Sequence, residues 1–157
     1  MNHAIIARFS ALLLAAAALA STACGSSFQP PRGFVELDDA GVYDHRATSA
    51  DGLVLATRHL DNDQKGELAF WTRAIENELR LRGGYALLET RDVKHQRGLT
   101  GKELHFGHDA ANASQLYTVA LYVTPESIHL IEAGGTRELM ETNKAQVDWA
   151  VRNLPLD

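Results

Sequence analysis

The sequence lacks the residues that identify several common classes of protein. It has one cysteine and four prolines in 157 residues, and its longest predominantly apolar run spans only residues 9–20. A lone cysteine cannot form a disulfide within its own chain, so a disulfide-stabilised scaffold is excluded. A transmembrane helix needs roughly 20 apolar residues, and this run is therefore too short to cross a bilayer.

Positive charge is scarce as well. Lys and Arg number 15 against 20 Asp and Glu, which gives a formal net charge of −5. The basic residues are interspersed with acidic ones, whereas nucleic-acid binding requires a basic stripe or patch. Attraction to an anionic membrane surface likewise requires a basic cluster. The sequence therefore predicts no nucleic-acid partner and no membrane attachment by charge alone.

Residues 1–23 do not have the pattern of a folded element. MNHAIIAR contains one Arg and no acidic residue, FSALLLAAAALA is apolar all round, and small residues follow it. This order is typical of a secretory signal peptide, with a positive start, an apolar core of about 7–15 residues and small residues at the cut. The alternatives are a buried N-terminal helix and cleavage by an ordinary signal peptidase at the A-x-A site of residues 18–20.

The one cysteine, Cys24, directly follows this segment. Residues 21–24, Ser-Thr-Ala-Cys, resemble the lipobox of a bacterial lipoprotein precursor, although Ser21 stands where that motif usually has Leu. The resemblance implies a type II signal peptide over residues 1–23, cleavage after Ala23 and attachment of palmitate-type lipid chains to Cys24. Two or three such chains would hold a protein at a membrane essentially permanently. The alternative is a secreted soluble protein with a free thiol.

The residues after Cys24 bear on localisation and domain boundaries. Gly25 stands where an Asp would retain a lipoprotein in the inner membrane, so the resemblance implies the outer membrane, facing the periplasm or the cell surface. Gly, Ser and the Pro30-Pro31 pair predict that residues 24–33 are a lipidated, flexible tether. We expect one globular domain over residues 34–157, because this stretch contains no second linker and no repeat.

Alternation of apolar and polar residues predicts most of the strands. In QLYTVALYVT the side chains of Tyr117, Val119 and Leu121 share one face, and Pro125-Glu126 forms a turn into SIHLIEA. Gly134-Gly135 is expected to end that strand. The predicted strands cover residues 33–37, 42–49, 52–60, 85–93, 102–108, 115–124 and 127–133.

Two segments have helical spacing. Over residues 66–82, apolar side chains including Leu68, Ile75 and Leu79 recur at three- and four-residue steps. Asp61 and Asp63 are expected to cap the start of this helix, and Gly83-Gly84 to end it. The second helix is predicted near the C-terminus, with a break at Thr142-Asn143, from the spacing of Met140, Val147, Val151 and Leu154.

The order of elements is strands, a helix, four antiparallel strands and a helix. Short connections between successive strands favour hairpins, so we predict an α+β fold in which an antiparallel sheet carries two main helices packed on one face. Over about residues 34–155 this order resembles the PsbP-like α/β sandwich. That resemblance implies a binding or assembly factor rather than an enzyme.

The loop DNDQKGELAFWT begins like a calcium-binding loop. Asp61, Asp63 and Gly66 occupy loop positions 1, 3 and 6, but Lys65 and Thr72 stand where oxygen ligands are required. The loss of those ligands removes the charge that binds the ion. We therefore predict no calcium site here.

The motif HFGHD is the densest group of metal-binding residue types. His105 and His108 are three residues apart, which places them on opposite faces of a strand. The polar side chains of Glu103, His105 and His129 instead form a candidate ligand-binding face of the sheet. We identify no catalytic residue, no metal ligands and no cofactor.

These observations predict a lipid-anchored protein of the cell envelope that serves as a binding or scaffold module for an envelope protein partner, without catalysis. The alternative is a periplasmic small-ligand-binding protein or enzyme that uses the polar sheet face. A concave pocket with convergent polar groups would favour the alternative. A flat apolar patch rimmed by charge would favour the partner-binding protein.

Cys24→Ala should release the protein from the membrane because it removes the only sulfur to which lipid can be attached. We expect the variant in the soluble fraction after cell fractionation, with the circular dichroism spectrum of the wild-type domain. Membrane association that persists in Cys24→Ala would contradict the anchor.

Overall fold

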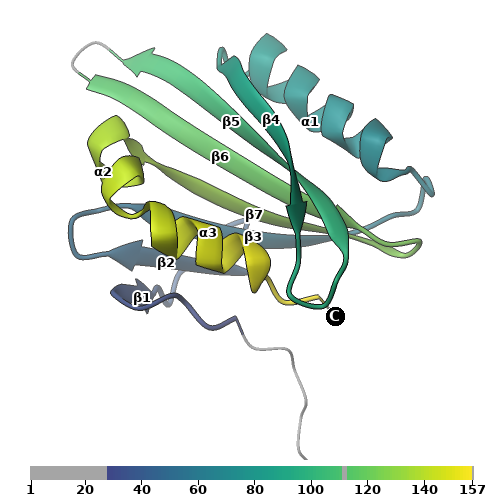
Figure 1. Ribbon diagram of the computed structural model, residues 1–157, viewed down its shortest axis with the longest axis horizontal. Coiled ribbons are helices and arrows are strands. Elements are labelled where there is room, and N and C mark those ends of the chain that lie inside the picture. Colours follow the sequence, from purple (N-terminus) through teal and green to yellow (C-terminus); the bar gives the residue numbers. More distant parts are fainter. Residues whose placement is uncertain (1–27, 111–112, 157) are drawn as a thin grey trace, which may run out of the picture.

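The chain forms one antiparallel sheet with helices packed on it (Figure 1). This computed structural model describes residues 28–110 and 113–156, so Ala23 and Cys24 lie outside the described residues. The strands are β1 (Phe34–Glu36), β2 (His45–Ser49), β3 (Val54–Asp61), β4 (Ala86–Lys94), β5 (Thr100–Ala110), β6 (Ala113–Val123) and β7 (Ser127–Thr136). The helices are α1 (Leu68–Leu81), α2 (Arg137–Thr142) and α3 (Lys144–Arg152).

The seven strands are arranged in the order β1-β2-β3-β7-β6-β5-β4, and every neighbouring pair is antiparallel. The four strands from β4 to β7 follow one another as hairpins, as predicted. β7 then pairs with β3, and this pairing joins the β1–β3 part of the sheet to the β4–β7 part. β1 and β4 form the two edges of the sheet. The prediction of an antiparallel α+β fold is confirmed.

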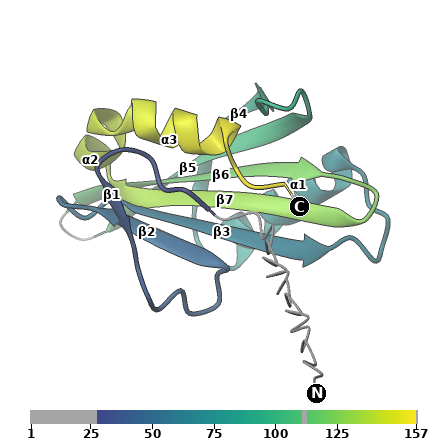
Figure 2. The ribbon, with the colours of Figure 1, turned by 90° about the horizontal axis from the view of Figure 1, so that it is seen from below.

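The helices lie on opposite faces of the sheet, so the expectation that they share one face is wrong (Figure 2). Helix α1 packs against Leu104, Phe106 and Val119, on the surface that we call the α1 face. Helices α2 and α3 pack against the other side, the α3 face, which includes Ala120, Tyr122, Ile131 and Ala133. None of the described helices is both long and apolar enough to cross a membrane.

The central strands explain why both faces are covered. In β6 the odd-numbered residues Val119 and Leu121 face α1, while the even-numbered Ala120 and Tyr122 face α3. A strand that is apolar on both faces must be buried on both. Since α1 carries the chain from β3 to the distant edge strand β4, it covers one face, and the chain that leaves β7 covers the other.

Helix α1 has the predicted apolar stripe and the predicted end. The amides of Gly83 and Tyr85 donate to the carbonyls of Glu78 and Leu79, and Gly84 adopts a φ of 69°, in the left-handed region. The predicted caps Asp61 and Asp63 do not serve that role. The helix begins after Glu67, whose side chain makes no capping hydrogen bond.

Asn62 organises the loop that resembles a calcium site. Its side chain is 1% exposed. Its Oδ1 accepts from the Gly66 amide at 2.9 Å and from the Trp71 indole at 3.0 Å, and its Nδ2 donates to the carbonyls of Gly66 at 3.0 Å and Thr124 at 2.9 Å. An amide side chain therefore holds this loop, and it joins β3 and α1 to the turn after β6.

The C-terminal segment differs from the prediction in one respect. Gly134 and Gly135 lie inside β7, which continues to Thr136, whose hydroxyl caps α2 by accepting from the Leu139 amide. The expected break at Asn143 is present and separates α2 from α3. The four predicted apolar residues are buried: Met140, Val147, Val151 and Leu154.

The segment before β1 packs against the domain from Phe28 onward. Phe28 is 5% exposed, belongs to the core of the α3 face and stacks on the His45 ring with centroids 5.4 Å apart. Pro31 is buried as well. The stretch predicted as tether, residues 24–33, therefore contributes its second half to the folded domain.

The hairpin between β4 and β5 is tied to the end of α3. His95 Nε2 lies 2.8 Å from the Leu154 carbonyl, while the Arg97 amide donates to His95 Nδ1 at 3.0 Å. The Gln96 amide donates to the Arg152 carbonyl at 3.0 Å. Burial lowers the pKa of His95, which favours the neutral ring that these contacts require. These bonds tie the β4–β5 hairpin to the end of α3.

Asn62→Ala should destabilise the domain, because the loop and the Trp71 indole lose their shared partner. We expect a loss of about 3 kcal/mol in the free energy of unfolding, measured by urea denaturation. Trp71→Phe removes one of the four hydrogen bonds and should cost only about 1 kcal/mol. Equal losses in the two variants would show that Asn62 does not organise the loop.

Candidate functional site

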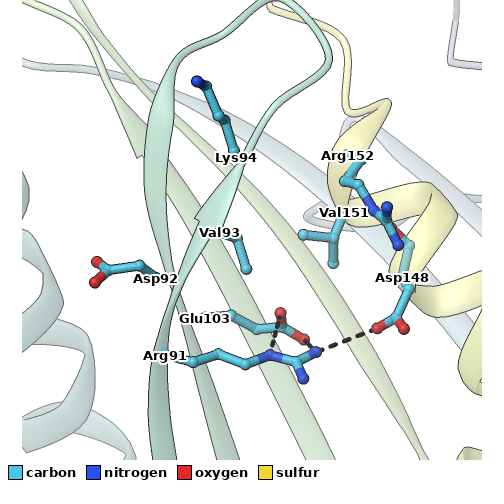
Figure 3. A pocket seen from close by; sticks show the side chains of 8 residues that line it. All are labelled: Arg91, Asp92, Val93, Lys94, Glu103, Asp148, Val151 and Arg152. Carbon is cyan, nitrogen blue, oxygen red and sulfur yellow. Dashed lines mark hydrogen bonds and ion pairs between the residues drawn. The ribbon is translucent and has the colours of Figure 1, made fainter.

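The α3 face contains two adjoining hollows between α2–α3 and the β4–β5 hairpin. They measure about 420 Å³ and about 230 Å³, and we refer to them together as the α3 groove. Both are lined by Arg91, Glu103 and Asp148, so the same charged residues lie where the hollows meet (Figure 3). β4 supplies Arg91, β5 supplies Glu103 and α3 supplies Asp148.

Glu103 is the most deeply buried charged residue of the groove, at 1% exposed. Arg91 donates from Nε to Glu103 Oε2 at 2.9 Å and from Nη2 to Glu103 Oε1 at 3.0 Å, as a two-point contact. The same Nη2 donates to Asp148 Oδ1 at 3.2 Å, and Lys144 Nζ donates to Asp148 Oδ2. This network joins the sheet to α3 across the floor of the groove (Figure 3).

The contacts of Glu103 keep it ionised. Burial acts to raise the pKa of its carboxyl, but the adjacent His105 ring and the Arg91 guanidinium outweigh burial and leave the pKa below its ordinary value. The hydrogen bond to Glu103 in turn raises the pKa of Arg91. The floor of the groove therefore carries a fixed, paired negative charge at neutral pH.

His105 extends the polar floor away from Arg91. Its Nε2 lies 3.2 Å from Glu103 Oε1, and its Nδ1 lies 3.1 Å from the Thr118 hydroxyl of β6. The Nε2 atom is itself buried and makes no well-aligned hydrogen bond with the protein. His105, Glu103 and Thr118 thus form a row of side chains that can donate to or accept from a molecule in the groove.

The smaller hollow has apolar walls above this floor. Leu116, Met140 and Val147 line it, together with Leu88, which is 56% exposed. Leu88 occupies an irregularity in the pairing of β4 with β5, between Leu87 and Glu89. Such a bulge redirects one side chain, and here it places an exposed leucine at the rim of the groove.

Only two of the three predicted ligand-face residues are brought together. His129 lies on the same face of the sheet as Glu103 and His105, but on β7, two strands away from β5. Its ring stacks on His59 at 4.9 Å between centroids, and it lines a separate hollow. The predicted polar face is not open to solvent, because Glu103 is 1% and His129 is 2% exposed.

The other histidine of the HFGHD motif lies away from the groove. His108 occupies the face of β5 opposite to His105, as predicted, and its ring contacts Tyr85 and the Gly84 carbonyl. Among the described side chains no three His, Cys, Asp or Glu residues are grouped so that they could bind a metal ion.

A second buried carboxylate, Glu132, lies on the α1 face. It accepts from Arg58 Nε at 2.9 Å and from the Tyr117 hydroxyl, while the Arg58 guanidinium lies 5.0 Å from the centre of the Tyr43 ring. Burial of the hydroxyl, together with the nearby Glu132, raises the pKa of Tyr117. The adjoining hollow measures only about 120 Å³, so the α3 groove is the better candidate site.

Sequence reasoning missed several groove residues. Arg91 and Asp148 are 57 positions apart in the chain and meet only because β4 pairs with β5 beneath α3. The one available signal was a strand Arg and a strand Glu on either side of a predicted turn, which a hairpin centred on Arg97 places opposite each other. The bulge at Leu88 left no sequence signal that we can identify.

Comparison with known proteins gives the fold but no family. No protein-family model and no curated protein matches the sequence. Among solved structures, PA94 from Pseudomonas aeruginosa, a protein of unknown function for which a regulatory role has been suggested, matches with a TM-score of 0.52 and 14% identity over 83% of this chain and 87% of its own. Cyanobacterial PsbP (CyanoP) from Synechocystis sp. PCC 6803 matches with a TM-score of 0.52 and 13% identity over 77% and 79%. The predicted resemblance to the PsbP-like fold is confirmed at the level of fold.

Glu103→Gln should destabilise the domain, because the Arg91 guanidinium loses its buried counter-charge. We expect a loss of about 3 kcal/mol in the free energy of unfolding at pH 7. Since the folded-state pKa of Glu103 is lowered, its contribution is present above the ordinary pKa of 4.5 and is lost as the pH falls further. The difference between wild type and variant should therefore shrink in acid.

The double variant Glu103→Gln with Arg91→Gln is the control for this pair. If the two side chains act as a unit, the double variant should lose less than the sum of the two single losses, by about 1–3 kcal/mol. Strictly additive losses, or a difference that stays constant down to pH 3, would contradict the ion pair.

Proposed function

We propose that this protein is a binding module of the bacterial cell envelope that holds a small amphipathic ligand in the α3 groove, without catalysis. The observation that carries the proposal is the concave site itself. Two hollows meet at the buried Arg91–Glu103 pair, with His105 beside it. Concave sites with a few convergent polar groups on an apolar background are the usual form of small-molecule sites.

The lining of the groove indicates the chemistry of the ligand. A polar end would meet the Thr118 hydroxyl and the His105 ring, which line the floor of the smaller hollow. An apolar body would contact Met140 and Val147 from the helices and Leu88 from β4. Because Arg91 already neutralises Glu103, the floor does not require a charged ligand. A molecule with a hydrogen-bonding head and a hydrocarbon or aromatic body fits this arrangement.

The envelope location is part of the same proposal and is supported by the sequence. The apolar segment of residues 9–20, the small residues before Cys24 and the lone thiol are explained together by export and lipid attachment. In this account cleavage follows Ala23, and the lipid on Cys24 holds the domain at the outer membrane. The anchor confines the groove to a layer near the membrane, where amphipathic molecules are concentrated.

A polypeptide partner is the second candidate, and the edge strand β4 favours it. Among the described strands β4 pairs with β5 alone, so its nine residues present a free edge directly beside the groove. An extended segment could add to that edge while one of its side chains enters the smaller hollow beside Leu88. This mode would make the protein a scaffold for an envelope protein.

Photo-crosslinking in cells tests the proposed site. The photoreactive residue p-benzoylphenylalanine replaces Leu88 at the rim of the groove, and in a matched control it replaces Leu81, which is 83% exposed at the end of α1 on the other face. After irradiation we expect an adduct at position 88 and none at position 81, measured by mass spectrometry of the purified protein.

The mass of the adduct separates the candidates. An added mass of small-molecule size supports the ligand-binding protein, whereas a polypeptide adduct supports the scaffold that uses the β4 edge. Equal labelling at positions 88 and 81, or none at either, would show that the groove is not the binding site.

A further inference from the structure

Another hollow lies on the other side of α3 from the groove, against the chain that precedes β1. It measures about 390 Å³ and lies between Pro30 and Pro31 on one side and Gln146 and Trp149 on the other, with Arg32 at its margin. In Figure 2 the dark purple segment that leads into β1 runs beside α3. The lining is mostly hydrocarbon and aromatic, unlike the charged floor of the groove.

Trp149 is an unusual residue for this position. Its side chain is 42% exposed, while its neighbours Ala150 and Val151 are buried. Beside it, the Gln146 Oε1 atom is buried and has no hydrogen-bond partner in the described structure. Arg32 is exposed. Indole and guanidinium side chains are both favoured at a membrane interface, because each has an apolar part that contacts lipid and a polar part that stays hydrated.

The position of the hollow along the chain points to what covers it. Phe28 is fixed in the core, so no more than a few residues separate the folded domain from Cys24. Gln29, which lines the hollow, follows Cys24 by five residues, and five residues span at most about 18 Å. A lipid on Cys24 places that residue among the headgroups. The hollow is therefore confined to within about 18 Å of them.

We propose that the surface formed by Arg32, Gln146 and Trp149 lies against the phospholipid headgroups when the protein is anchored through Cys24. This inference rests on the lipid attachment in the proposed function. Arg32 would pair with lipid phosphate, and Trp149 would enter the interfacial layer. The anchor and this surface together fix the orientation of the domain, with α1 on the side of the sheet away from the membrane.

Fluorescence quenching in vesicles tests this orientation, because the chain offers a matched pair of tryptophans. The lipidated protein is reconstituted into phosphatidylethanolamine–phosphatidylglycerol vesicles that contain lipids with a nitroxide on the headgroup. Trp71→Phe leaves Trp149 as the only emitter, and Trp149→Phe leaves Trp71, which packs against the α1 face. We expect loss of most Trp149 emission and little change for Trp71. Arg32→Glu should weaken the quenching of Trp149.

The controls distinguish failure of this inference from failure of the anchor. Intact-mass spectrometry first establishes whether Cys24 carries lipid, and a bare thiol would remove both the anchor and the orientation. If Cys24 is lipidated but both tryptophans are quenched to the same extent, the orientation is wrong while the anchor stands. A second measurement needs no substitution at either tryptophan. Fluorotryptophan labelling of the wild type gives two ¹⁹F resonances, and in the nitroxide-containing vesicles only that of Trp149 should broaden.

Discussion

The architecture around the groove depends on one buried carboxylate. Glu103 lies between the sheet and α3, where an unpaired charge would be strongly unfavourable, and it must therefore be held by partners. Arg91 meets this need from β4 and reaches Asp148 on α3 with the same guanidinium. The pair thus fixes the edge of the sheet relative to the helix. Because polar side chains occupy the floor, the space above it is a groove and is not filled by apolar core side chains.

The two-sided sheet separates this charged site from the rest of the core. Apolar residues on both faces of β6 require a cover on each side, and α1 fills its face closely. On the opposite face α2 and α3 are short and joined at Asn143, so they leave room along β4 and β5. The same face receives the segment from Phe28 to Arg32. Groove, N-terminal segment and exposed Trp149 therefore lie around a single helix.

Local patterns in the sequence predicted more of the fold than of the site. The alternation of Leu104 with Glu103 and of Phe106 with His105 predicted the two faces of β5. Gly83-Gly84 and Pro125 marked the turns before β4 and after β6. Those patterns do not show which elements that are distant in the sequence pack against one another. Whether a helix covers one face or the other depends on the order of all seven strands, and the meeting of Arg91 with Asp148 depends on that choice. The bulge at Leu88 depends on pairing register, which the periodicity of a single strand does not define.

The central claim is that the α3 groove holds a ligand in the protein as it occurs in the cell. Native mass spectrometry of wild-type protein purified gently from its own cells tests this directly, in parallel with Glu103→Gln. The account predicts wild-type protein with a non-covalently bound small molecule, and loss or weakening of that complex in the variant. Wild-type protein without a non-covalently bound molecule, or a complex unchanged by Glu103→Gln, would contradict it.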